Sequence, residues 1–189
     1  MRDRTRDPEA GGTFSRPEVQ EPLISWWKIL CRSGGDLKIL RRCRTPAEVA
    51  CTPVFHRLRH QLEPLVPLSP EHCVHLALVA GVLSHVNRNM PEEYEREVRR
   101  SFAAQMARPF RIRGPWKKAR VSSLRFRHLL GINDPDRLYP ALIRVVRLLG
   151  GSVDIASLAE SIYLWGDHTK REWACAYYAY ALREEEQGS

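Results

Sequence analysis

Residues 121–151, VSSLRFRHLLGINDPDRLYPALIRVVRLLGG, decide the fold because their apolar side chains recur with the period of an α-helix. One helical stripe carries Leu138, Leu142, Val145, Val146 and Leu149. Asp134 followed by Pro135 is typical of a helix start, and Gly150–Gly151 is typical of a helix end. The arginines of the stretch fall outside the apolar stripe, so we expect them to face water or a partner.

Helix starts of the same kind recur along the chain, each with a capping Ser, Thr or Asp. The expected caps are Asp36, Thr45, Ser69, Ser122 or Ser123, Asp154 and Thr169. The first helix is expected over Leu23–Arg32. In the helix expected from Pro70 to about Val86, core positions recur every four residues. They are Val74, Leu78, Val82 and Val86. No stretch alternates like a strand over a sustained length, so the predicted fold class is all-α, a two-lobe helical bundle protein.

Composition shifts along the chain suggest four segments. Residues 1–20 are polar and predict a flexible N-terminal tail. Residues 21–107 predict an N-terminal helical lobe that ends with a charged helix over Glu92–Ala107. Residues 108–121 form a basic connector, because the run RPFRIRGP is interrupted by proline and glycine. Residues 122–189 predict a C-terminal helical bundle with short connections.

The charge of the chain favours an anionic partner. Lys and Arg number 30 against 22 Asp and Glu, giving a net charge of +8. From Val98 through Asn133 there is no acidic residue. The same window holds ten cations: Arg99, Arg100, Arg108, Arg111, Arg113, Lys117, Lys118, Arg120, Arg125 and Arg127. The acids at Glu92–Glu97 and Glu184–Glu186 offer the alternative, a solvated face that the fold neutralises. A weaker cluster comprises Lys38, Arg41, Arg42 and Arg44.

Aromatic residues add one candidate contact. Trp116 lies among cations in PWKKAR and is a candidate for stacking on a base or a sugar. The other tryptophans lie beside apolar neighbours, so we expect them in the core.

Several other classes of function find little support in the sequence. The five cysteines include no C-x-x-C pair, and the His56/His60 and His72/His75 pairs lack further ligands, so we expect no metal and no cofactor. No phosphate-binding loop or protease motif is present, so no catalytic residue is assigned and we expect no enzyme. The absence of a long apolar run predicts no membrane span, and the absence of an apolar leader predicts a cytoplasmic protein.

Five segments carry a resemblance to a known family. They are RRCRTPAEV at 41–49, PVFHRL at 53–58, RFRHLL at 125–130, LIRVVRLL at 142–149 and VDIASLA at 153–159. In this order they resemble the CasB family, the small subunit of the type I-E CRISPR Cascade surveillance complex. The agreement in spacing extends over most of residues 22–182. It does not include the N-terminal tail or the Glu92–Ala107 helix.

The resemblance implies a non-catalytic, all-helical subunit that serves antiviral defence inside Cascade. It implies partners as well: other Cascade subunits, the CRISPR RNA ribonucleoprotein, single-stranded and double-stranded target DNA, and a second copy of the chain. Members of the family hold nucleic-acid backbone, including the displaced strand of the R-loop, without reading sequence. By motif position the resemblance points to Arg41, Arg42, Arg125 and Arg144 as nucleic-acid-binding residues.

Charge alone adds a second set of candidate binding residues, namely Arg111, Arg113, Lys117, Lys118, Arg120 and Arg127. Two other classes of protein remain open. One is a helix-turn-helix DNA-binding regulator, whose basic helices would enter a major groove. The other is a structural adaptor, whose basic face would bind acidic protein.

Overall fold

The computed structural model describes residues 12–90, 98, 101–111 and 117–187, and most of these residues are helical. This confirms the predicted all-α class. The first part of the chain comprises η1 (Thr13–Ser15), α1 (Pro17–Arg32), α2 (Gly34–Arg42), α3 (Pro46–Ala50), α4 (Pro53–Leu62), α5 (Pro70–Leu83) and β1 (Arg88–Asn89). The second part comprises α7 (Phe102–Ala107), β2 (Pro109–Arg111), β3 (Lys117–Ala119), α8 (Ser123–Leu130), α9 (Pro135–Leu148), β4 (Ser152–Val153), α10 (Ile155–Tyr163) and α11 (Asp167–Gln187).

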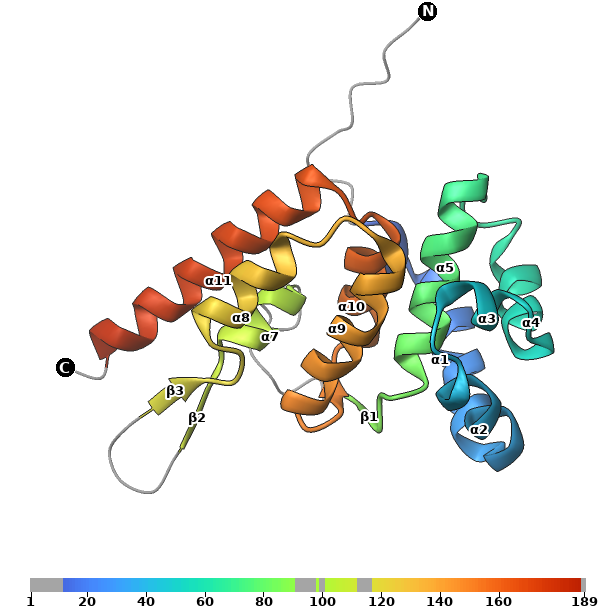
Figure 1. Ribbon diagram of the computed structural model, residues 1–189, viewed down its shortest axis with the longest axis horizontal. Helices are drawn as coiled ribbons and strands as arrows, with labels where there is room; N and C mark the ends of the chain where they lie inside the picture. Colours follow the sequence, from blue (N-terminus) through green and yellow to red (C-terminus); the bar gives the residue numbers. More distant parts are fainter. Residues whose placement is uncertain (1–11, 91–97, 99–100, 112–116, 188–189) are drawn as a thin grey trace, which may run out of the picture.

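The arrangement places α5, α9 and α10 at the middle of the molecule. Figure 1 shows α1 to α4 at one end of the long axis and α7, α8 and α11 at the other, with the β2–β3 hairpin projecting from that second end. α5 packs against α3, α9 and α10, and all of its residues from His75 to Leu83 are buried. Gly81 allows a close approach, because a Cβ there would lie 2.5 Å from Cε2 of Tyr139 on α9.

Several predicted caps are confirmed by hydrogen bonds. Thr45 Oγ1 accepts from the backbone N–H of Glu48 at 3.2 Å, which starts α3. Ser69 Oγ accepts from His72 N–H at 3.3 Å, which starts α5. Asp154 Oδ1 accepts from Ser157 N–H at 2.9 Å, which starts α10. These caps are local in sequence, so their residue types predict them without knowledge of the fold.

Two predicted caps are wrong. Ser33, three residues before Asp36, caps α2 and accepts from the Asp36 N–H, so Asp36 lies inside the helix. Thr169 lies inside α11, which begins at Asp167, and its hydroxyl donates to the Leu164 carbonyl at 2.5 Å. In both cases the helix starts earlier than its apolar pattern indicates.

The burial predicted for Val74 is also wrong, whereas burial of the other three positions is confirmed, although α5 ends at Leu83 and Val86 lies beyond it. Val74 is 41% exposed, while Leu78, Val82 and Val86 are at most 1% exposed. The reason is that α3 and the first turn of α9 leave a shallow pocket of about 320 Å³ beside Val74.

The start of the helical part lies earlier in the chain than predicted. α1 begins at Pro17, six residues before Leu23. The described part of the predicted tail, residues 12–20, packs onto the body, because Phe14 is fully buried and its ring meets Tyr163 of α10 edge-on at 5.2 Å. The carboxylate of Glu160 accepts hydrogen bonds from the backbone N–H groups of Thr13, at 2.9 Å, and of Phe14. Residues 1–11 lie outside the described part.

The predicted basic connector contains a short antiparallel hairpin. Pro109 of β2 pairs with Ala119 of β3, and Arg111 pairs with Lys117. A second short pairing is parallel and joins β1 to β4, with Arg88 opposite Ser152. The buried cluster is continuous from Phe14 to Tyr177 and extends across the two predicted lobes, whose division stays a prediction.

Candidate nucleic-acid interface

A groove with a volume of about 730 Å³ lies between α8 and α9. Its floor includes the buried side chains of Val121, Leu129 and Val145. The other lining residues are Leu124, Arg125, His128, Ala141, Arg144, Arg147 and Leu148. The described lining contains no acidic residue, so the groove combines an apolar floor with cations on exposed positions.

The helical period explains why these residues share one groove. On α8, Arg125 and His128 are three residues apart and therefore lie on the same face. On α9, Arg144 and Arg147 have the same spacing. The opposite faces of both helices enter the core. Phe126 of α8, for example, is fully buried and stacks on Tyr177 with ring centroids 4.0 Å apart.

A fourth arginine extends the basic surface onto α2. Nε of Arg41 donates to the backbone carbonyl of Ser84 at 2.8 Å, and Nη2 donates to Oδ1 of Asn87 at 3.4 Å. These bonds fix the guanidinium at the carboxyl end of α5. The resemblance named Arg41 as a binding residue. In the structure its guanidinium is held by Ser84 and Asn87, in the segment that follows α5.

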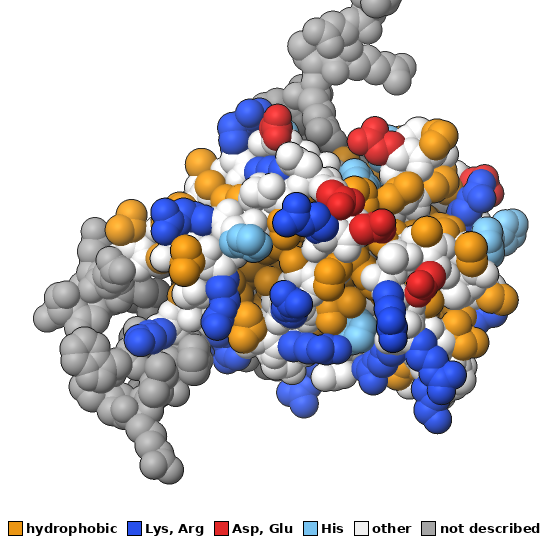
Figure 2. All heavy atoms as spheres, in the orientation of Figure 1, with side chains coloured by type: hydrophobic (Ala, Val, Ile, Leu, Met, Phe, Trp, Pro, Cys, Tyr) orange, Lys and Arg blue, Asp and Glu red, His pale blue; other side chains and the backbone are white. Residues whose placement is uncertain are grey.

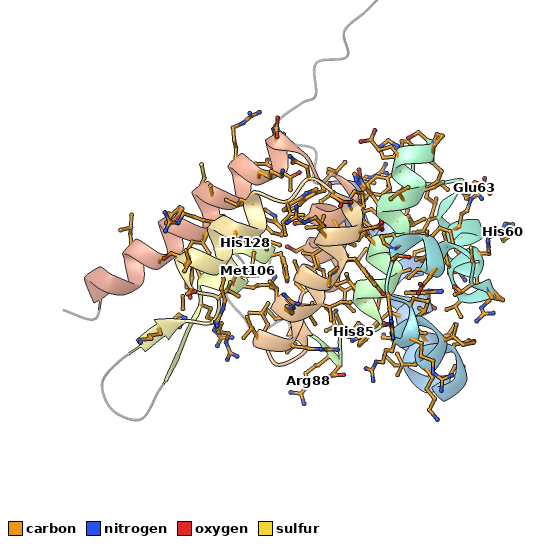
Figure 3. The ribbon with its side chains drawn as sticks, viewed as in Figure 1. His60, Glu63, His85, Arg88, Met106 and His128 are labelled. Carbon is orange, nitrogen blue, oxygen red and sulfur yellow. The ribbon has the colours of Figure 1, made fainter. Side chains whose placement is uncertain are left out.

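His85 shows that the α2 and α9 arginines lie near each other. The pKa of His85 is lowered to about 4, first by burial and then by the positive charges of Arg147 and Arg41. Figure 3 labels His85 at the lower end of α5, between α9 and α2. Its imidazole is therefore neutral at neutral pH, beside two guanidinium groups from separate helices.

We define Arg41, Arg125, Arg144 and Arg147 as the arginine row. All four side chains are exposed. Within the described part of the chain, none of them forms an ion pair with an acidic side chain within 4.0 Å. Arg57 differs, because it pairs with Asp36 at 2.5 Å. Figure 2 shows Lys and Arg side chains gathered along the lower edge of this face, over α8, α9 and α2, with apolar side chains between them.

The other predicted residues on the helices are exposed but lie outside the groove. Arg42 is exposed in the last turn of α2, and Arg127 is exposed on α8. Neither forms an ion pair with a described acid. The groove lining includes neither residue.

The two described cations of the predicted hairpin set, Lys118 and Arg120, do not line the groove. Lys118 is exposed on β3, and Arg120 is partly buried beside a pocket of about 60 Å³ that Arg108 and Leu149 also line. The backbones of Arg111 and Lys117 are opposite each other in β2 and β3, and their side chains lie outside the described part. Arg113 and Trp116 lie outside the described residues altogether.

Arg147 and Arg88 are two of the exposed cations that the predicted set omits. Arg147 belongs to the groove, and its spacing of three residues from Arg144 is the sequence pattern that would have included it. Arg88 is exposed on β1 below the end of α5, as Figure 3 shows. No local pattern relates Arg88 to the other cations, since only the parallel pairing with β4 brings it to this edge.

The histidine pair considered for metal binding has other partners. Nδ1 of His72 lies 2.8 Å from Ser69 Oγ, and Nδ1 of His75 lies 3.0 Å from the Tyr163 carbonyl. Among the residues that the structure describes, no group of three or more His, Cys, Asp or Glu is placed to hold a metal ion. No helix in the same part of the chain combines the length and the apolar character that crossing a membrane requires.

Comparison with known proteins identifies the family. The family model for the CRISPR-associated protein Cse2 matches residues 36–178. A chain of E. coli Cascade bound to a PAM-containing dsDNA target shares the fold, with a TM-score of 0.59 and 14% sequence identity, and the match covers 85% of this chain and 97% of that chain. CasB from Thermus thermophilus gives a TM-score of 0.51 and 21% identity, and covers 86% of this chain and 98% of that chain.

None of the curated proteins matches the chain in sequence. The family model, however, spans most of the 189 residues and includes all four members of the arginine row. The protein therefore belongs to the family of the CRISPR-associated protein Cse2.

Proposed function

We propose that this protein is a non-catalytic subunit of a Cascade surveillance complex and that it holds nucleic-acid backbone through the arginine row. The observation that carries the proposal is the convergence of four exposed arginines from α2, α8 and α9, none paired with a described acid. Leaving like charges unbalanced destabilises a fold unless an anion compensates them. Guanidinium groups bind phosphate oxygens in bidentate geometry, which suits a nucleic-acid strand.

The chemistry of the groove favours binding without sequence recognition. Within the part of the chain that the structure describes, its lining contains no Asn or Gln, the side chains that form paired hydrogen bonds with adenine. In RNA-guided complexes, base pairing between guide and target supplies sequence specificity, while protein cations stabilise the backbone and the displaced strand. We therefore expect the protein to support R-loop formation in target DNA, beside the CRISPR RNA ribonucleoprotein and a second copy of itself.

The helix-turn-helix alternative is less well supported by the charges of α9. A recognition helix presents its N-terminal residues to the base edges of the major groove. The N-terminal end of α9 carries Asp134 and Asp136, both exposed, which DNA phosphates would repel. The remaining alternative, an adaptor with a basic protein-binding face, is decided by the experiment below.

The test is the salt dependence of binding to a labelled single strand. Each arginine that neutralises a phosphate contributes about 0.7 to the slope of log affinity against log salt. The triple variant Arg125→Ala, Arg144→Ala, Arg147→Ala should therefore lower the slope by about two. A matched control replaces Lys28, Arg57 and Arg171 with alanine; these residues are exposed on α1, α4 and α11 and their loss changes the net charge equally.

The control should keep the slope of the unmodified protein. An equal loss in both variants would mean that net charge, rather than the groove, determines binding. An unchanged slope in the triple variant would favour the adaptor, and retention of an acidic protein partner would then depend on the same three arginines.

A further inference from the structure

The groove between α8 and α9 exposes apolar side chains among its arginines. Leu124 is 68% exposed and Leu148 is 41% exposed, although both lie in a groove that also contains Arg125 and Arg144. Val121, Leu129 and Val145 extend this apolar surface downward to the core. Contact with phosphate gives no reason to expose leucine, because phosphate remains hydrated or binds cations.

We propose that this groove receives an unpaired nucleobase of a single strand, which lies against Leu124 and Leu148 while Arg125, Arg144 and Arg147 bind the neighbouring phosphates. This inference rests on the proposed function and adds to its phosphate contacts a site for the base of an unpaired nucleotide. The site then prefers single-stranded to double-stranded nucleic acid.

The order of groups in the groove matches the order in a nucleotide. A base has two apolar faces and is joined through its sugar to a charged phosphate, so an apolar floor with cations on its rim complements both ends. The volume of about 730 Å³ lies within the range of about 300–1,000 Å³ that small-molecule sites occupy. Among the described residues the lining contains no Phe, Tyr or Trp, so the base lies against the two leucines, with the imidazole of His128 as the aromatic ring of the lining.

A duplex fits the groove less well. Its bases are stacked inside the helix, so it presents phosphates and polar base edges, and Leu124 and Leu148 would lose water contacts without an apolar partner. A single strand offers the faces of its bases at no further unpairing cost.

An acidic amphipathic protein helix is the competing occupant. The arginine row favours a nucleic acid because it continues beyond the groove to Arg41 on α2. Arg41 lies close enough to Arg147 that the charges of both lower the pKa of His85. A charged backbone that leaves the groove at Arg147 meets Arg41 next, so the strand gains a further cation outside the apolar floor.

The experiment compares two strands of equal length and equal phosphate count, oligothymidine and its abasic analogue. Fluorescence anisotropy with the full chain measures both affinities over a range of salt concentrations. The unmodified protein should bind oligothymidine about fivefold to tenfold more tightly than the abasic strand, because a base face is buried on two leucines. The double variant Leu124→Ser, Leu148→Ser should bind the two strands alike and keep the salt slope of the unmodified protein.

Two further variants make the result specific to the groove. Ile29→Ser combined with Leu182→Ser removes apolar side chains that are 54% and 58% exposed outside the groove, and should keep the preference for oligothymidine. Leu124→Trp adds a stacking surface at the same position and should raise the affinity for oligothymidine only.

The outcomes separate this inference from the proposed function. Equal affinity of the unmodified protein for both strands, with a normal salt slope, would overturn the base site and leave the phosphate-binding role intact. Binding to neither strand would overturn both. If the leucine variant kept the preference for oligothymidine but lost a protein subunit of its complex, the groove would be a protein-docking site and the base site would be wrong.

Discussion

The two basic regions of this molecule differ in how the chain builds them. The hairpin cations, which include Arg108, Lys118 and Arg120, follow one another in an acid-free stretch of sequence. The arginine row instead combines residues from position 41 to position 147, and the folding of α2, α8 and α9 brings them to one surface. The hairpin region is visible as a charge density in the sequence, whereas the row exists only in the folded chain.

The difference extends to the support beneath each region. The helices α8 and α9 present arginines on one face and enter the buried core with the other. At the base of the hairpin the N–H of Val121 donates to the carbonyl of Met106 in α7 at 3.0 Å, a backbone bond that joins this region to the body. Binding by side chains on a packed support loses less conformational entropy, so we expect the row to hold a strand more tightly per cation.

The largest effect is expected from removing the support of the row. Phe126 of α8 is fully buried and stacked on Tyr177, so Phe126→Ala should lower the free energy of unfolding by about 3–5 kcal/mol. Urea denaturation measures the change. On the same helix, Leu124→Ala is the control; Leu124 is 68% exposed, so its effect should remain within about 0.5 kcal/mol. Similar effects from both variants would mean that α8 is not anchored by its buried face.

A second comparison measures how many phosphates each basic region binds. Alanine at Arg111, Arg113, Lys117 and Lys118 should lower the single-strand salt slope by about two to three, if most of these cations contact phosphate. When this variant is combined with the triple arginine variant of α8 and α9, the two losses should add if each region binds its own phosphates. A combined loss equal to that of the triple variant alone would mean that one strand does not reach the hairpin.

A third prediction concerns the packing of α5 against α9, the helix that carries Arg144 and Arg147 of the arginine row. Gly81→Ala would place a Cβ 2.5 Å from the Tyr139 ring, so α5 and α9 would have to separate, at a cost of about 1–3 kcal/mol. The control is Gly34→Ala at the start of α2, where a Cβ meets nothing within 4 Å. The control should retain full stability, and thermal denaturation of both variants tests the contrast. Equal midpoints would show that Tyr139 moves aside freely.

The smallest effect is expected from His85. Its pKa of about 4 in the folded chain lies below the ordinary value of 6.5, so the unfolded chain binds more protons between these values. Stability should therefore fall as the pH falls from about 6.5 toward 4, by about 1 kcal/mol once solvent screening is allowed for. His85→Gln should remove this component. Urea denaturation at about pH 7 and about pH 5 measures it, and identical pH profiles for both proteins would contradict it.

The helices were predictable from sequence because their determinants are local. Thr45, Ser69 and Asp154 cap helices through bonds to residues three positions ahead, and a pattern of that length is read without tertiary information. The exposure of Val74 was not predictable, since it depends on how much of α5 the distant helices α3 and α9 cover. Strands of three residues, such as β2, are too short to show an alternating pattern.

The candidate site was predictable only in part, for the same physical reason. Arg41, Arg125 and Arg144 could be named from their motifs, and helical spacing places Arg144 beside Arg147. The meeting of Arg41 with Arg147 beside His85 required the packing of α2, α5 and α9, which no local pattern contains. The apolar floor could not be found from sequence, because the sequence does not show whether a leucine is buried in the core or exposed in a groove.

The bonds between Glu160 and the backbone of Thr13 and Phe14 have a practical consequence for handling the protein. Residues that precede the first long helix belong structurally to α10, almost 150 positions later, and cover Tyr163. A recombinant chain that starts at residue 17 would leave this carboxylate without its two backbone donors and would bare an aromatic surface. Affinity tags and fluorescent fusions are therefore better attached after α11, the last helix, whose end lies at one side of the molecule (Figure 1). A fusion there leaves the bonds between Glu160 and residues 13–14 in place.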